Sequence, residues 1–163
     1  MKKFGLILLA GCLAGCDYTV PLAESPALPL DPALAGLWSR TRPDGEAETL
    51  LVLPLDKREC LVSFPAGTPD AMFGRACLAQ AAGLTLAQVR WIGTARGKQP
   101  EEARVYQYAD FSVAGGRLSV RLLNGDAVAR EAASAADLAR AIADKKDDPA
   151  LFREALVFDR IKP

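Results

Sequence analysis

Histidine is absent from this sequence of 163 residues. Its absence excludes the Ser-His-Asp and Cys-His systems of nucleophilic catalysis, the zinc sites that use histidine, and the most common general base. The Gly-x-Ser-x-Gly turn of hydrolases and the glycine-rich loops that bind phosphate are also missing. We therefore expect a protein that is not an enzyme and that has no cofactor and no metal site.

The sequence also lacks an excess of positive or negative charge, since 20 lysine and arginine residues balance 20 aspartate and glutamate residues. Nucleic acids and anionic lipid surfaces bind proteins through concentrated basic patches, and the charges here are scattered along the chain. The sequence accordingly predicts no nucleic-acid partner.

The N-terminal hydrophobic run, residues 4–14, is shorter than the roughly twenty residues that a transmembrane helix needs. It follows the positive pair Lys2-Lys3, an arrangement typical of a secretory signal peptide. The run ends in the tetrapeptide Leu-Ala-Gly-Cys twice, at Cys12 and at Cys16. Cys12 would leave a hydrophobic segment of only about seven residues, so Cys16 is the expected end of the leader and Cys12 the alternative.

The stretch Leu13-Ala14-Gly15-Cys16 resembles the lipobox of bacterial lipoproteins. The resemblance implies that residues 1–15 are a signal peptide, that a diacylglycerol is joined to the sulfur of Cys16, and that the new amino group is acylated. Several acyl chains, at about 0.8 kcal/mol for each buried methylene, would anchor the protein stably. The resemblance therefore places the protein in the cell envelope, anchored to the inner or the outer membrane and facing the periplasm.

Prolines at positions 21, 26, 29 and 32 dominate the segment that follows Cys16. Such segments favour extended conformations and act as semi-rigid spacers. We expect residues 16–35 to form the lipidated cysteine and its tether, and residues 36–163 to form a single β-rich domain.

Alternating apolar residues predict strands in most of this domain. Residues 48–55 and 58–64 read as a hairpin, and so do residues 104–113 and 117–122 around the turn Gly115-Gly116. For residues 73–80 a strand is favoured over a helix.

A single helix is expected after residue 134, because Ser134 and Asp137 resemble a capping box, and a last strand is expected near the C-terminus, at residues 155–161. The fold class is thus mainly β (α+β): an antiparallel meander of about seven or eight strands with one C-terminal helix before the last strand. A meander of this length tends to curl, so we expect a small barrel or a strongly bent sheet.

Two cysteines, Cys60 and Cys77, remain in the predicted domain. Export to an oxidising compartment would permit a disulfide, which would close a loop of about 17 residues and contribute roughly 3 kcal/mol. Two buried free thiols are the alternative.

The tripeptide Gly36-Leu37-Trp38 resembles the Gly-x-Trp motif of lipocalins and related calycin barrels. The resemblance implies that Trp38 lies at the floor of a barrel, that Arg160 from the last strand packs across its ring, and that the interior carries a ligand. The family's second motif is not found. The domain is also similar to small uncharacterised lipoproteins of Gram-negative bacteria, which implies no activity.

Tyr106 and Tyr108 fall on the polar face of one predicted strand, and Arg117 and Arg121 on the same face of its partner. They either form a contact surface for a carbohydrate, a peptide or an acidic group, or are ordinary cross-strand pairs on a solvated sheet.

Two hypotheses for function follow. The preferred one is a non-enzymatic accessory module that binds an envelope protein. The alternative is a calycin-like carrier of a small apolar ligand, which requires a hollow barrel.

Overall fold

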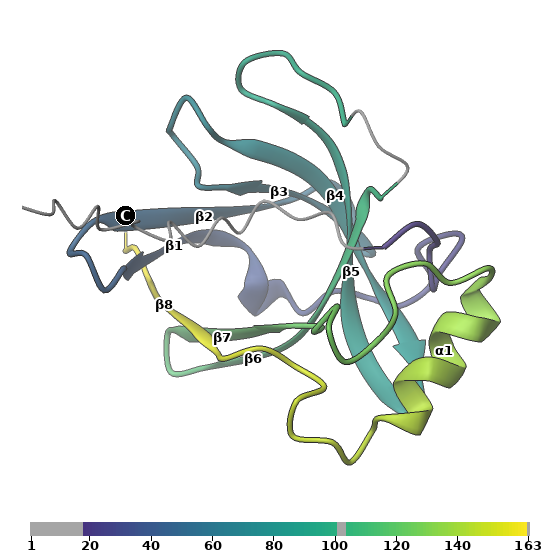
Figure 1. Ribbon diagram of the computed structural model, residues 1–163. Helices are drawn as coiled ribbons and strands as arrows, with labels where there is room; N and C mark the ends of the chain where they lie inside the picture. Colours follow the sequence, from purple (N-terminus) through teal and green to yellow (C-terminus); the bar gives the residue numbers. More distant parts are fainter. Residues whose placement is uncertain (1–17, 101–103, 163) are drawn as a thin grey trace, which may run out of the picture.

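Eight antiparallel strands, each hydrogen-bonded to its neighbours in chain order, close into a barrel in the computed structural model (Figure 1). The structure describes residues 18–100 and 104–162, so the predicted signal peptide, Cys12 and Cys16 lie outside it. The strands are β1 (Gly36–Thr41), β2 (Ala47–Pro54), β3 (Glu59–Phe64), β4 (Met72–Ala81), β5 (Leu84–Thr94), β6 (Tyr106–Ala114), β7 (Arg117–Leu122) and β8 (Leu156–Arg160). A helix, α1 (Ala135–Asp144), lies between β7 and β8, and a short 3-10 helix, η1 (Pro32–Leu34), precedes β1. The predicted β meander with one late helix is confirmed, and it closes into a barrel.

The hairpin of β6 and β7 shows why the sequence forms this barrel. Phe111 pairs with Val120 and Val113 with Leu118, so the apolar residues of both strands share the inner face. Polar residues between them share the outer face. Gly115 and Gly116 make the turn with φ angles of 58° and 78°, which residues with side chains rarely adopt.

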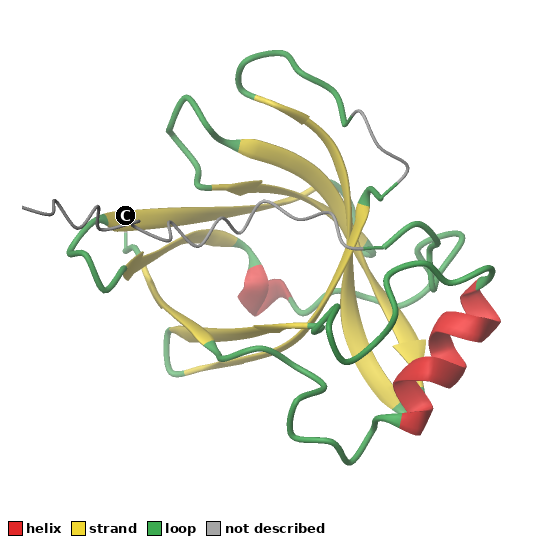
Figure 2. Ribbon diagram, viewed as in Figure 1, coloured by secondary structure: helices red, strands yellow, loops and turns green. Residues whose placement is uncertain are grey.

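The barrel closes where β1 meets β8. Trp38 is fully buried and is registered opposite Arg160, whose guanidinium carbon lies 4.1 Å from the centre of the Trp38 ring. Arg160 also donates hydrogen bonds to the carbonyl groups of Ala33 and Ala35, the latter at 2.6 Å. The indole Nε1 of Trp38 donates to the carbonyl of Leu34 at 2.9 Å. These contacts hold η1 across one end of the barrel, inside its outline in Figure 2.

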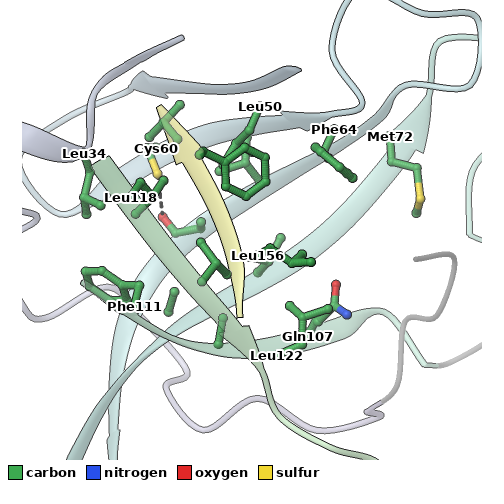
Figure 3. Close-up of a pocket in the computed structure, with 18 of the residues that line it drawn as sticks. Leu34, Leu50, Cys60, Phe64, Met72, Gln107, Phe111, Leu118, Leu122 and Leu156 are labelled. Carbon is green, nitrogen blue, oxygen red and sulfur yellow. Dashed lines mark hydrogen bonds between the residues drawn. The ribbon is translucent and has the colours of Figure 1, made fainter. Parts of the chain in front are cut away.

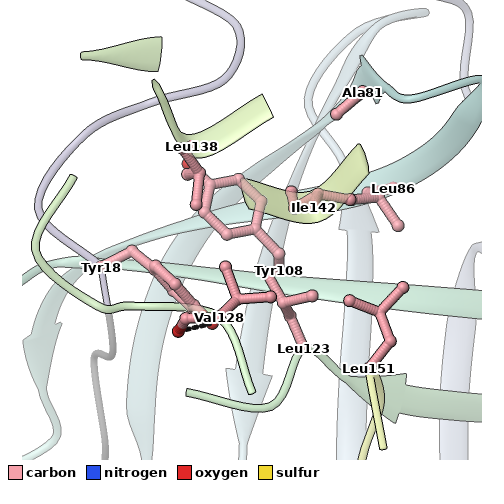
Figure 4. Close-up of a cluster of buried hydrophobic side chains, with 9 residues drawn as sticks. All are labelled: Tyr18, Ala81, Leu86, Tyr108, Leu123, Val128, Leu138, Ile142 and Leu151. Atoms are coloured by element: carbon pink, nitrogen blue, oxygen red, sulfur yellow. Dashed lines mark hydrogen bonds between the residues drawn. The ribbon is translucent and has the colours of Figure 1, made fainter. Parts of the chain in front are cut away.

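An apolar cluster, here called the outer cluster, lies on the outer side of the barrel wall (Figure 4). Its buried members come from α1, from β4 to β6, and from the segments before β1 and around α1: Tyr18, Ala81, Leu86, Tyr108, Leu123, Val128, Leu138, Ile142 and Leu151. Ser134 caps α1 by accepting a hydrogen bond from the backbone of Asp137, as predicted. The outer cluster attaches α1 to the barrel without filling the interior.

The segment predicted to be a spacer lies against the barrel from residue 18 onward. Residues 18–23, here called the N-terminal strap, are held by the side chains of Gln88 and Tyr108, and Leu30 donates a backbone hydrogen bond to Lys57. Prolines keep the chain extended, but they leave backbone groups that side chains on the barrel can bind. The prediction that the whole segment holds the domain away from a membrane is therefore wrong for residues 18–35.

The variant Gly36→Ala tests the contact that closes the barrel between β1 and β8. Gly36 has a φ of +132°, and a Cβ there would lie 2.7 Å from a guanidinium nitrogen of Arg160. We expect a loss of about 3 kcal/mol in the free energy of unfolding, measured by denaturant titration, since backbone strain is combined with displacement of Arg160.

Gly45→Ala is the matched control, because Gly45 also has a positive φ but no atom within 4 Å of its Cβ position. It should lose only the strain energy, about 1 kcal/mol. Equal losses for the two variants would show that the contact with Arg160 contributes nothing to closure.

Candidate functional site

The interior of the barrel contains a cavity of about 550 Å³ (Figure 3). This volume falls within the range of about 300–1,000 Å³ that is typical of sites for small molecules. Most of the wall is formed by inward-facing aliphatic and aromatic side chains, among them Leu50, Val52, Val62, Phe64, Met72, Leu78, Val89, Trp91, Phe111, Leu118, Val120, Leu122, Leu156 and Phe158. The cavity is thus an apolar chamber inside a closed sheet.

Several wall residues are only partly buried although they point inward. Leu50, Val62, Val89 and Leu156 have intermediate exposure because they border the cavity, although they also pack against buried residues of the barrel interior. Apolar surface of this kind gains free energy when an apolar molecule covers it. The barrel therefore has an apolar interior surface that its own side chains do not completely cover.

The two ends of the cavity differ. One end is closed by η1, through Leu34, together with Leu30. At the other end the lining includes Arg42 and Asp70, from the β1–β2 and β3–β4 loops, whose side chains are 39% and 75% exposed. We call this loop end the mouth.

The charges at the mouth neutralise one another. Arg42 lies 2.6 Å from Asp44 and 3.8 Å from Glu48, and Asp70 lies 2.8 Å from Arg96. Every charged residue of the lining therefore has an oppositely charged partner from the protein.

Gln107 is the polar residue set into the apolar wall. It is the second residue of β6, it is 8% exposed, and Figure 3 shows it among the apolar side chains. Among the described residues, its amide has no hydrogen-bond partner. Sequence analysis missed this residue, although the signal was present: Gln107 interrupts the inward series that contains Ala109, Phe111 and Val113.

The predicted aromatic and cationic surface is not formed. Tyr108 is fully buried under the N-terminal strap, where its hydroxyl donates to the carbonyl of Val20 at 2.6 Å and accepts from the amide of Leu22 at 3.0 Å. Burial raises the pKa of Tyr108 well above its ordinary value, so this hydroxyl stays protonated. Tyr106 is half-buried and pairs through its backbone with Tyr18.

The two arginines of that prediction lie apart from the strap in ion pairs of their own. Arg117 is 3.3 Å from Asp159, and Arg121 pairs with Asp110 and lies 5.1 Å from the ring centre of Phe152. The sequence correctly predicted that the side chains of both tyrosines and both arginines point outward. It did not predict the strap that covers the tyrosines.

Cys60 and Cys77 are free thiols, so the predicted disulfide is wrong. Cys60 is registered opposite Ala76, and the next residue, Cys77, therefore points to the other face of the sheet. Cys60 lines the cavity, whereas Cys77 lies on the outer face, where the amide of Gln88 reaches its sulfur at 3.8 Å. The register separates the two sulfurs by the thickness of the sheet.

The described residues contain no cluster of three or more acidic or cysteine side chains that could hold a metal ion. Within residues 18–100 and 104–162, no helix has the length and hydrophobicity needed to cross a membrane. No protein-family model, curated protein or solved structure matches the chain.

Thiol chemistry tests whether Cys60 and Cys77 are free thiols. We expect addition of dithiothreitol to leave the melting temperature unchanged, and peptide mapping after alkylation in denaturant to find Cys60 and Cys77 both modified. A peptide pair that is linked by a disulfide before reduction would contradict the observed register.

Burial also raises the pKa of Cys60 from 9.0 to about 11. The folded state thus holds the thiol proton more tightly than the unfolded state, and the free energy of unfolding should fall as the pH rises from 9 toward 11. In the variant Cys60→Ala, the free energy of unfolding should fall less steeply between pH 9 and pH 11.

Proposed function

We propose that the protein is a membrane-anchored carrier that binds a small apolar ligand inside its barrel. The observation that carries this proposal is the apolar cavity of about 550 Å³ within the closed sheet. A carrier requires such a chamber, whereas an accessory module does not. The contact between Trp38 and Arg160, beside Gly36, supports a calycin-like arrangement of the floor.

Contact with the apolar wall supplies the main part of the binding energy that this role requires. A chain of ten carbons moved from water into an apolar site gains about 8 kcal/mol, at about 0.8 kcal/mol for each methylene. That gross gain corresponds to a dissociation constant near 1 μM before the entropy of association is subtracted. Reversible binding, which suits a carrier, is the expected result.

The position of Tyr18 supports a membrane as the source of the ligand. The backbone of Tyr18 exchanges two hydrogen bonds of 3.0 Å with Tyr106, the first residue of β6. Tyr106 follows the β5–β6 loop, which lies at the mouth end because alternate loops of an up-and-down barrel share one end. The two peptide units between Cys16 and Tyr18 span at most about 7 Å. If Cys16 carries lipid, as the lipobox resemblance implies, the mouth therefore lies near the bilayer surface.

Native mass spectrometry of the full protein, extracted gently from membranes, tests both parts of the proposal. We expect a peak heavier than the lipidated chain that loses a discrete small mass on denaturation. The denatured mass should correspond to a lipidated chain that begins at Cys16. A native peak that carries no small molecule would count against the carrier.

Ala87→Phe provides a variant that acts on the cavity alone. Ala87 lines the wall beside Ala109, its register partner on the neighbouring strand, and a phenyl group there would occupy part of the chamber. We expect the bound mass to disappear while the barrel stays folded. Gln80→Leu, at an exposed residue outside the lining, is the control and should retain it.

An accessory role remains the second candidate, because one part of the outer surface is apolar. Leu37, Leu53 and Ile161 are 42%, 48% and 41% exposed, and the backbones of Leu37 and Ile161 are hydrogen-bonded. Contiguous exposed apolar surface often marks a protein contact.

Leu53→Lys should abolish crosslinking to an envelope protein in cells if this surface binds a partner. Ile92→Lys, at a residue of β5 that is 43% exposed, should leave the crosslink intact. Equal crosslinking by both variants and the unmodified protein would exclude this surface.

A further inference from the structure

We infer that the cavity selects an uncharged single-chain lipid, whose hydroxyl or carbonyl group hydrogen-bonds to the side-chain amide of Gln107 near the mouth while its chain extends toward Trp38. This inference rests on the proposed carrier function and adds the chemical class of the ligand. It depends on Gln107, on the charges at the mouth and on the direction of the cavity.

Gln107 is mostly buried, and its amide atoms are accessible from the cavity, since they are not among the fully buried side-chain atoms that lack a partner. An amide that faces an apolar chamber loses hydrogen bonds to water, and a protein normally compensates for that loss with a partner. Gln107 is 8% exposed and lines the cavity, yet its amide makes no hydrogen bond to any described residue. A group on the ligand can complete it, and the amide can both donate to a carbonyl and accept from a hydroxyl.

Gln88, at a comparable level of burial, shows the contrast. Its side chain faces outward and makes three hydrogen bonds of 2.7–2.9 Å to the backbone of Leu22 and Ala23. This chain therefore satisfies a buried glutamine fully where the fold requires it. The unfilled hydrogen-bonding capacity of Gln107 belongs to the cavity and not to the barrel scaffold.

The charges of the lining favour a neutral ligand. Arg42 is the cationic residue of the lining, and it is already paired with Asp44 and Glu48. Glu48 and Asp70 add negative charge at the same end. A buried carboxylate needs an unpaired cation, so the chamber disfavours a fatty acid in its ionised form.

The direction of the cavity sets the orientation of the ligand. Gln107 stands one residue after the start of β6, at the mouth end, whereas Leu30 and Leu34 close the far end, where the indole of Trp38 donates to the carbonyl of Leu34. Between these ends the lining is apolar, with Phe111 and Leu118 on β6 and β7. A lipid that enters with its chain first places its polar group beside Gln107.

Displacement of the neutral fluorophore N-phenyl-1-naphthylamine from the purified full chain tests the inference. The competitors are decan-1-ol, methyl decanoate, decanoate and decane, at pH 8. We expect decan-1-ol or methyl decanoate to bind at least tenfold more tightly than decanoate. The alcohol and the ester distinguish whether the amide mainly accepts or mainly donates.

Gln107→Leu should weaken the preferred neutral competitor about five- to tenfold, the usual effect of one lost hydrogen bond, and leave decane and the fluorophore unchanged. Gln80→Leu should change none of these affinities. Retained binding of the fluorophore shows that the variant is folded, and the comparison of competitors on the unmodified protein needs no variant.

Two results would overturn the inference and leave the carrier function standing: decanoate that binds as tightly as decan-1-ol, or unchanged affinities in Gln107→Leu. Failure of the unmodified protein to bind the fluorophore and every competitor would instead overturn the carrier function, and the inference with it.

Discussion

Closure of the barrel between β1 and β8 is the constraint on which the cavity depends. The guanidinium of Arg160 covers the ring of Trp38 and binds two carbonyl groups of the η1 segment, so one side chain joins the last strand, the first strand and the floor. Gly36 leaves the space that Arg160 occupies. Without this joint the sheet would have two free edges, and its apolar inner face would be open to water or to another chain.

The width of the barrel follows from closure, and the volume of the cavity follows from the size of the wall residues. An eight-stranded barrel is just wide enough for its side chains to fill the interior or to surround one small ligand. Here Ala76, Ala87 and Ala109 line the cavity from the neighbouring strands β4, β5 and β6. Their short side chains do not reach the opposite wall, and the interior remains hollow.

A hollow interior contributes less packing energy, and the outer cluster compensates for part of that loss. Leu138 and Ile142 of α1 are fully buried against the barrel wall, next to Tyr18 and Tyr108. The N-terminal strap adds hydrogen bonds to Gln88 and Tyr108 on the same side. The fold thus has two packed apolar clusters, one outside the barrel wall and one inside it beside the cavity.

The amino-acid sequence was enough to predict the strands, their order and the late helix, because these depend on local alternation, turn glycines and the cap at Ser134. It also indicated the pairing of Trp38 with Arg160 through a motif. Features that require distant residues to meet appear only in the folded barrel. The β3–β4 register sends Cys60 and Cys77 to opposite faces and prevents a disulfide. The strap covers Tyr108, since Gln88 and Tyr108 meet its backbone only after the barrel forms. The cavity around Gln107 likewise exists only in the closed barrel, where residues far apart along the chain form one wall.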